Sequence, residues 1–227
     1  MIRLSLDVVG ACGTRVPVGA SDWHYLTQVM RRESGDRIEV LAEDGEVFEA
    51  VLVDGQHVEI RGKVANVRKP RRHITLYQAL LKGDHFSEVV ERATEAGISR
   101  FVPIVTERSI VRDVSPNKAA RWRAIAKEAS EQCQRPDVPG IEEMKRVSDL
   151  RAAAGSDAFV LDPRANDARP WLVPADHPLD IVIGPEGGFT PAELDLLSAR
   201  GFLPLSLGER VYRAENAGAF AAVLFLQ

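Results

Sequence analysis

The stretch IVIGPEGGFTPAEL, residues 181–194, places a glycine-rich loop directly after a run of aliphatic residues and before a helix-like pattern. Glycines let the main chain approach a ligand closely, whereas Pro185 limits the flexibility of the loop. In parallel sheets, ligands bind where the carboxyl ends of strands lead into helices. The loop Gly184–Gly188 is therefore a candidate ligand-binding loop, and an ordinary strand-to-helix turn is the alternative.

This loop lacks the two commonest nucleotide-binding motifs. A P-loop needs Gly-Lys-Ser/Thr after its glycines, because the lysine and the hydroxyl engage phosphates and magnesium. No such triplet follows Gly188, and the dinucleotide pattern Gly-x-Gly-x-x-Gly is absent from the chain. A nucleotide triphosphatase and a nicotinamide dehydrogenase are therefore disfavoured.

A second group of polar residues lies on a predicted long helix that begins at Ser115-Pro116. Glu128, Gln132 and Arg135 are spaced i, i+4 and i+7, which would place them on one helix face. A carboxylate, an amide and a guanidinium together could hold a flipped base and its phosphate. A solvated helix face is the alternative.

The cysteines and histidines indicate neither a metal site nor a covalent nucleophile. Cys12 and Cys133 are too few and too far apart for a disulfide framework or a zinc site. Cys133 has no histidine nearby in sequence to activate it, so we expect an idle or buried thiol. None of the five histidines has metal-ligand spacing, and we expect no metal and structural or solvated histidines.

The composition is that of a soluble globular protein. Of 227 residues, 45% are hydrophobic and 27% are charged, and no apolar run approaches the roughly 18 residues that a membrane helix needs. The amino-terminal sequence MIRLSLD has no signal-peptide pattern. We therefore expect a cytoplasmic protein without membrane contact.

Positive charge is unevenly distributed although the net charge is −4. Residues 61–72 carry six basic residues and no acidic one, and a second basic stretch covers residues 100–135. Solvated faces and phosphate contacts are both compatible with these stretches.

The hydrophobic pattern changes near Pro70 and predicts two domains. Between residues 37 and 64, alternating apolar residues joined by Asp-Gly pairs predict β-hairpins. From residue 71 onward, strands alternate with helices, as in an α/β domain whose parallel sheet is covered on both faces. The predicted strands of this domain are 74–81, 101–105, 158–161, 179–183 and 203–207, and the helices are 86–96, 115–134, 190–200 and 214 onward.

Two segments carry a resemblance to a known family. IGPEGGFTPAE at 183–193 and LSLGERVYRAENA at 205–217 together resemble the paired motif of the RsmE family, SPOUT-class enzymes that methylate N3 of a uridine in small-subunit ribosomal RNA. The segments 24–45, 80–109 and 121–139 are similar to further blocks of that family, in the same order.

The resemblance implies an α/β fold with a SPOUT-type parallel sheet and a trefoil knot at its carboxyl end over residues 71–227. A small PUA-like RNA-binding β barrel would precede it at residues 1–70. The resemblance also implies a homodimer, S-adenosylmethionine as methyl donor without a metal, and small-subunit ribosomal RNA within the 30S subunit as the partner.

The same resemblance implies a cofactor pocket in which main-chain groups hold the adenine. Its residues would be Leu161, Ile183, Gly184, Pro185, Glu186, Gly187, Gly188, Leu205, Leu207, Gly208, Arg210, Val211, Tyr212 and Ala214. The residues expected to contact RNA are Arg31, Arg32, Arg68, Lys69, Arg71, Arg72, Lys82, Arg108, Arg112 and Gln132.

The expected catalytic residues are Glu128, Arg135 and Arg213. Glu128 is the first candidate for removing the N3 proton, and Arg213 would offset charge on the uracil. For Glu186 we expect hydrogen bonds from main-chain amides or from the cofactor's amino group, which would fix the loop, and no role as a base.

The chain departs from the family pattern at Ala214 and Asn216, where threonines are usual. Two other functions remain open. One is a different SPOUT reaction, such as ribose 2′-hydroxyl methylation, and the other is RNA binding without catalysis. The intact Gly184–Gly188 loop argues against the latter.

Overall fold

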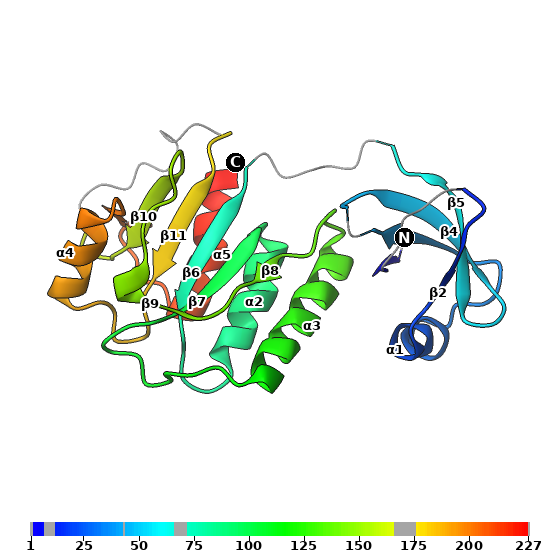
Figure 1. The fold of residues 1–227 in the computed structure, drawn as a ribbon, viewed down its shortest axis with the longest axis horizontal. Coiled ribbons are helices and arrows are strands. Elements are labelled where there is room, and N and C mark those ends of the chain that lie inside the picture. Colours follow the sequence, from blue (N-terminus) through cyan, green and yellow to red (C-terminus); the bar gives the residue numbers. More distant parts are fainter. Residues whose placement is uncertain (1, 7–11, 43, 66–71, 166–175, 227) are drawn as a thin grey trace. The chain divides into compact units, whose positions relative to one another are not determined.

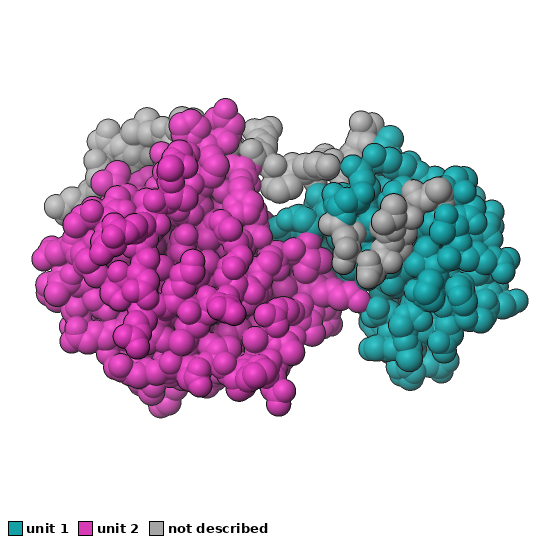
Figure 2. Space-filling view, in the orientation of Figure 1, with its two compact units in different colours: residues 1–69, 130–137 teal, residues 70–129, 138–227 magenta. Residues whose placement is uncertain are grey.

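The computed structural model describes residues 2–6, 12–42, 44–65, 72–165 and 176–226. The chain forms two compact units, one of residues 1–69 with 130–137 and one of residues 70–129 with 138–227, coloured separately in Figure 2. Because residues 130–137 group with the amino-terminal part of the chain, a single linear boundary does not describe these units.

The first unit is built on a five-stranded sheet with the order β1-β3-β4-β5-β2. Its strands are β1 (Arg3–Ser5), β2 (Arg15–Pro17), β3 (Arg37–Leu41), β4 (Val47–Val53) and β5 (His57–Lys63). Strands β3, β4 and β5 pair antiparallel, as the Asp-Gly turns predict, and Gly45 and Gly55 have the positive φ that such turns need. Strand β1 pairs parallel to β3 and was not predicted, because three residues carry too little periodicity.

A helix closes the core of this unit. Helix α1 (Ala20–His24) continues into the π-helical turn η1 (Tyr25–Val29). Leu26 of this turn is fully buried against residues of the sheet such as Ile38 and Leu52.

The end of the long helix α3 (Pro116–Cys133) is held by the first strand. The guanidinium of Arg3 donates to Glu39 at 2.9 and 2.6 Å and to the main-chain carbonyls of Gln134 and Arg135. The helix ends at Cys133, because Gln134 adopts a φ of +60°. Arg135 therefore lies outside the helix, and the expectation that it shares a helix face with Glu128 and Gln132 is wrong.

The second unit is built on a seven-stranded sheet in which every strand pair is parallel. The strand order is β12-β10-β11-β6-β7-β8, and β9 also pairs with β7. Figure 1 shows the central strands side by side. The strands are β6 (Ile74–Ala79), β7 (Arg100–Val105), β8 (Gly140–Ile141), β9 (Lys145–Arg146), β10 (Asp157–Leu161), β11 (Leu179–Ile183) and β12 (Leu203–Leu205).

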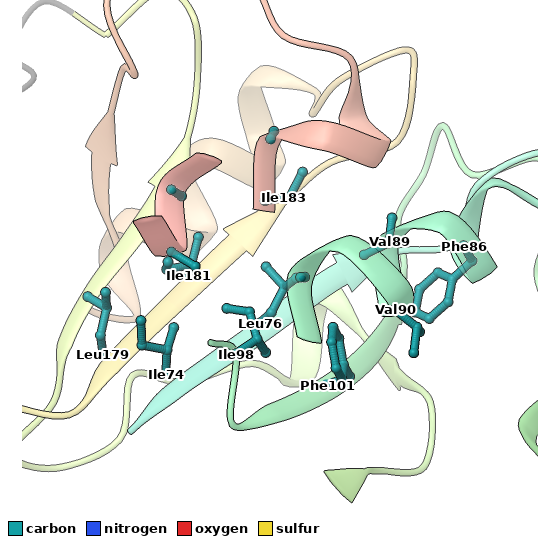
Figure 3. Packing of buried hydrophobic residues seen from close by; sticks show 14 of the residues in the cluster. Ile74, Leu76, Phe86, Val89, Val90, Ile98, Phe101, Leu179, Ile181 and Ile183 are labelled. Atoms are coloured by element: carbon teal, nitrogen blue, oxygen red, sulfur yellow. The ribbon is translucent and has the colours of Figure 1, made fainter. Parts of the chain in front are cut away.

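Helices cover both faces of this sheet, as predicted. On one face, α2 (His85–Glu95), α3 and α5 (Ala214–Leu226) pack on Ile74, Leu76 and Ile181, and Figure 3 shows part of this core. On the other face, α4 (Pro191–Ala199) and the 3-10 turn η2 (Val147–Asp149) pack on alternate residues of the same strands. The sheet is buried on both sides, which explains the nearly continuous hydrophobic runs in its strands.

Three helix ends of the second unit follow local sequence signals. The hydroxyl of Ser115 accepts the N–H of Lys118 at 3.3 Å at the start of α3. Thr190 and Glu193 form a reciprocal capping box at the start of α4. After α2 the chain turns at Gly97, whose φ of +102° favours glycine.

In the part of the chain that the structure describes, no helix is long and apolar enough to cross a membrane.

Candidate functional site

A cavity of about 730 Å³ lies at the carboxyl edge of the second unit's sheet. It is formed by the loops that follow β6, β7, β10, β11 and β12 and by the start of α5. The lining residues are His85, Arg108, Leu161, Asp162, Pro163, Arg164, Ile183, Gly184, Pro185, Glu186, Gly187, Gly188, Phe189, Leu194, Leu205, Ser206, Leu207, Arg210, Val211, Tyr212, Arg213, Ala214, Glu215 and Ala217.

The structure brings together the residues that were expected to bind the cofactor, with one exception. Gly208 does not line the cavity, but its φ of +111° allows the turn between Leu207 and Arg210, which do. Of the three expected catalytic residues, only Arg213 lines the cavity.

The centre of the glycine-rich loop is hydrogen-bonded to two neighbouring loops. Oε1 of Glu186 accepts the main-chain N–H of Lys82 at 3.0 Å, and Nη1 of Arg108 donates to the carbonyl of Gly187 at 2.7 Å. Glu186 thus accepts a hydrogen bond from a main-chain amide, one of the two interactions expected for it.

Glycine at position 184 allows close packing against Phe189. A Cβ atom at Gly184 would lie 3.0 Å from the Phe189 ring, closer than carbon atoms normally approach. The bare main chain of Gly184 therefore forms part of the cavity wall.

A buried carboxylate fixes the far end of this loop. Glu193, only 7% exposed, accepts the N–H of Thr190 at 2.9 Å and the N–H of Glu107 at 2.8 Å. One side chain therefore caps α4 and joins it to the loop that follows β7, where Arg108 lies.

Asp162 and Arg164 form a pair at the cavity wall after β10. The guanidinium of Arg164 donates to both carboxylate oxygens of Asp162 at 3.0 Å. Burial acts to raise the pKa of Asp162, but the hydrogen bonds and charge of Arg164 outweigh it and hold that pKa below its ordinary value.

The loop between β12 and α5 brings exposed side chains to the cavity. Val211 is 76% exposed, and Tyr212 packs its ring on Phe220 with centroids 4.9 Å apart. Arg213 is almost fully exposed and lies 3.8 Å from the buried carboxylate of Glu215.

Several lining residues were missed from the sequence, among them His85, Asp162, Arg164, Ser206 and Glu215. The rule that ligands bind at carboxyl strand ends could have found His85, which follows β6, and Asp162, which follows β10. His85 was missed because the histidines have no metal-ligand spacing and were expected to be structural or solvated.

The other two expected catalytic residues lie elsewhere. Glu128 is exposed on α3, as is Gln132 one turn later. Arg135 is only 9% exposed and donates to both carboxylate oxygens of Asp137, at 3.1 and 2.8 Å.

The residues expected to contact RNA differ in exposure. Arg31, Lys82, Arg108 and Arg112 are exposed, and Arg32 is partly exposed with an ion pair to Asp36 at 3.8 Å. Arg72 is only 4% exposed, so its side chain is not on the surface. Arg68, Lys69 and Arg71 lie outside the described residues.

The side chains around the cavity are chemically mixed. Arg108, Arg164, Arg210 and Arg213 contribute positive charge, and Asp162, Glu186 and Glu215 contribute negative charge. Within the described residues, no group of three or more histidine, cysteine, aspartate or glutamate side chains is arranged to hold a metal ion.

A family model described as an RNA methyltransferase domain matches residues 68–226. The ribosomal RNA small subunit methyltransferase E of Synechocystis is 34% identical over 215 residues, which cover 91% of this chain and 71% of that protein. Its namesake from Bacillus subtilis is 30% identical over 215 residues, covering 87% of this chain and 84% of that protein.

A solved structure shares the whole architecture. A Legionella pneumophila protein, assigned as a methyltransferase and solved with bound S-adenosylmethionine, superimposes with a TM-score of 0.88 at 29% identity. The match covers 99% of this chain and 96% of that one.

Proposed function

The chain belongs to the RsmE family of ribosomal RNA methyltransferases, and we propose that it methylates N3 of a uridine in small-subunit ribosomal RNA with S-adenosylmethionine as methyl donor. The observation that carries this proposal is the cavity, because the glycine loop and the β12–α5 loop form its walls together. These are the two segments that hold the family motif.

The residues of the cavity wall are chemically suited to S-adenosylmethionine. The main chain at Gly184 and Gly187 is accessible to an adenine ring, and Leu161, Ile183 and Leu205 add apolar surface. Carboxylates can hold the ammonium group and the ribose hydroxyls, and an arginine can hold the carboxylate. When bound, the cofactor supplies an electrophilic methyl group on a sulfonium centre.

The residues of the chain must orient the uridine and manage the proton on N3. We propose that Arg213, exposed at the cavity mouth, offsets negative charge on the uracil as the N3 proton leaves. Glu128 and Gln132, exposed on α3, are proposed to contact the RNA. Arg135, buried and paired with Asp137, is proposed to hold the segment after α3 in place.

For RNA binding we propose surfaces on each unit. Residues 1–70 are proposed to form a PUA-like RNA-binding domain, with Arg31 and Arg32 on its surface. In the SPOUT domain, residues 71–227, the exposed cations Lys82, Arg108 and Arg112 are proposed to contact phosphates. We leave Arg72 out of this surface because it is buried.

The path of the chain supports a carboxyl-terminal trefoil knot. After β11 the chain passes through α4 on one face of the sheet to the edge strand β12. It then returns on the other face as α5, which packs on α2, β6 and β11. The segment after β11 thus covers both faces of the strands that form the cavity, and a knot requires in addition that this segment pass through a loop of the preceding chain.

We further propose a homodimer that acts on the 30S subunit in the cytoplasm. Phe220, Val223 and Leu224 are 44%, 45% and 41% exposed and share one face of α5 by their i, i+3 and i+4 spacing. Apolar residues gathered on a helix face mark an interaction surface, and a second copy is the proposed occupant.

Calorimetric titration with S-adenosylmethionine, followed by methyl transfer, tests the proposal. We expect the wild-type chain to bind one cofactor and to transfer labelled methyl groups to small-subunit but not large-subunit RNA. Gly184→Val, whose side chain would displace the Phe189 ring that also lines the cavity, should lose binding. Gly140→Ala, at an open position away from the cavity, should bind normally. Folded wild-type protein that does not bind the cofactor would contradict an enzymatic function.

A further inference from the structure

His85 lines the cavity, although nothing in its sequence context marked it as functional. It is the first residue of α2 and follows the loop between β6 and α2. The same loop donates the N–H of Lys82 to Glu186 of the glycine-rich loop. His85 is therefore attached to the cavity through a loop that contacts the proposed cofactor-binding segment.

The imidazole of His85 has a defined partner. Its Nδ1 lies 3.1 Å from Oε1 of Glu88, one turn further along α2. Glu88 uses its other oxygen, Oε2, to bind Arg92 at 2.8 Å, and Arg92 donates to Asn216 of α5 at 2.6 Å. Both oxygens of Glu88 are thus engaged, which holds the carboxylate in place beside the histidine.

This arrangement sets the tautomer of the neutral imidazole. A carboxylate can only accept, so Nδ1 carries the proton and Nε2 has the free electron pair. Among the described residues, Nε2 has no hydrogen-bond partner. The same order of carboxylate, imidazole and free Nε2 serves as a general base in hydrolytic enzymes, where the carboxylate is buried. Here the side chains of His85 and Glu88 are 48% and 40% exposed.

The other acids and bases of the cavity are less suited to accept a proton. Asp162 is held by two hydrogen bonds from Arg164, and Glu186 accepts a main-chain N–H. Glu215, the third carboxylate of the cavity, lies 3.8 Å from the guanidinium of Arg213. Arginines remain protonated, and carboxylates are much weaker bases than an imidazole. General-base catalysis is most effective when the basicity of the group matches the working pH, which favours a histidine.

We propose that His85 is the proton acceptor for uridine N3, an assignment that rests on the proposed function. Nε2 takes the proton from N3, and the electron pair left on N3 forms the new bond to the methyl carbon. The bond between that carbon and sulfur breaks, and its electron pair stays on sulfur as a neutral thioether. The imidazolium then releases its proton to water.

The test compares His85→Gln with His177→Gln. His177 also pairs with a carboxylate, Asp157 at 3.3 Å, but at the amino edge of the sheet and outside the cavity. Production of 3-methyluridine by the wild-type protein on small subunits first establishes the proposed function separately.

We then expect His85→Gln to lower kcat by about 100-fold or more, the usual contribution of a general base. Its affinity for S-adenosylmethionine should stay within about threefold of wild type, and His177→Gln should match wild type in both measurements.

Two further readouts distinguish a base from a structural residue. Imidazole added to His85→Ala should restore part of the lost kcat. In the wild-type protein, nitrogen NMR of His85 should show the Nδ1-protonated tautomer. A wild-type kcat in His85→Gln, a loss of cofactor affinity that accounts for the loss in rate, or the Nε2-protonated tautomer would each overturn the proposal. So would a large loss of kcat in Glu128→Gln with none in His85→Gln.

Discussion

At the scale of single residues, Glu186 is a carboxylate that lines the cavity, as a catalytic acid or base would, but its hydrogen bond joins two loops of the fold. Its carboxylate accepts the N–H of Lys82 at 3.0 Å and so links the glycine-rich loop to the loop after β6. The glycine-rich loop lines the cavity and the loop after β6 adjoins it, so the hydrogen bond between Lys82 and Glu186 helps to fix the cavity wall.

We predict that Glu186→Ala weakens the binding of S-adenosylmethionine. A charge-assisted hydrogen bond at an exposed site contributes about 1 kcal/mol, or about fivefold in the dissociation constant. Titration calorimetry measures this change, and Glu186→Gln, which keeps an accepting oxygen, should show a smaller one. An alanine variant that bound the cofactor normally but transferred no methyl group would contradict the structural role.

Asp162 provides a prediction on pH. Its pKa is lowered in the folded protein, so its pair with Arg164 stabilises the fold above the pKa of the unfolded chain. This stabilisation is lost as the pH falls from about 5, just above the ordinary carboxyl pKa, through the lowered pKa of Asp162. Urea unfolding should show wild type losing more stability over that range than Asp162→Asn, and Arg164→Gln should resemble Asp162→Asn. If all three proteins lost the same free energy of unfolding over that range, the pair of Asp162 and Arg164 would not stabilise the fold.

Residue roles were only partly predictable from the sequence. A local sequence pattern located the glycine loop and the family resemblance located the loop at Leu207, because the geometry of both loops depends on neighbouring residues. The contacts of His85 and Arg164 with the cavity depend on strands that meet only in the folded sheet. The environment of Arg135 depends on a left-handed residue at Gln134, which no helical spacing reveals.

At the scale of elements, α4 is attached to the site through one buried carboxylate. Glu193 caps its own helix through Thr190 and accepts the N–H of Glu107 from the loop after β7. The helix and that loop therefore depend on the same side chain.

We predict that Glu193→Ala lowers the free energy of unfolding by about 2 kcal/mol or more. The substitution leaves two main-chain N–H groups without their acceptor, and each loss costs about 1 kcal/mol or more. Urea unfolding measures this change. Asp195→Asn, at an exposed position of the same helix, should stay within about 0.5 kcal/mol of wild type. Similar values for the two variants would contradict the role of Glu193.

The elements themselves were largely predictable. Strands β3, β4 and β11 and helices α2, α3 and α5 lie where periodicity, Asp-Gly turns and caps place them. The two-residue strands β8 and β9 were missed because they form only by pairing with β7. Strand β12 ends at Leu205, whereas alternation predicted Leu207, because the chain turns there toward the cavity.

At the scale of the whole molecule, the structure of one chain bears on the proposed homodimer only through its exposed surface. The exposed apolar face of α5 supports a second copy as its partner, and Tyr212, which lines the cavity, packs on Phe220 of that face. A dimer formed there would lie next to the cofactor site.

We predict that Phe220→Glu with Leu224→Glu converts the protein from dimer to monomer, because burying two unpaired charges in an interface is costly. Sedimentation velocity measures the change in mass. Lys118→Glu, on α3, should remain dimeric. A wild-type monomer at micromolar concentration would contradict the proposed homodimer, and a double variant that stays dimeric would place the interface elsewhere.

The overall function is tested most directly by identifying the methylated nucleoside. Small subunits that lack the modification are incubated with the protein and S-adenosylmethionine, and the RNA is digested and analysed by mass spectrometry. We predict 3-methyluridine as the new product. A ribose 2′-O-methylated nucleoside, or no methylation by protein that binds the cofactor, would contradict methylation of uridine N3.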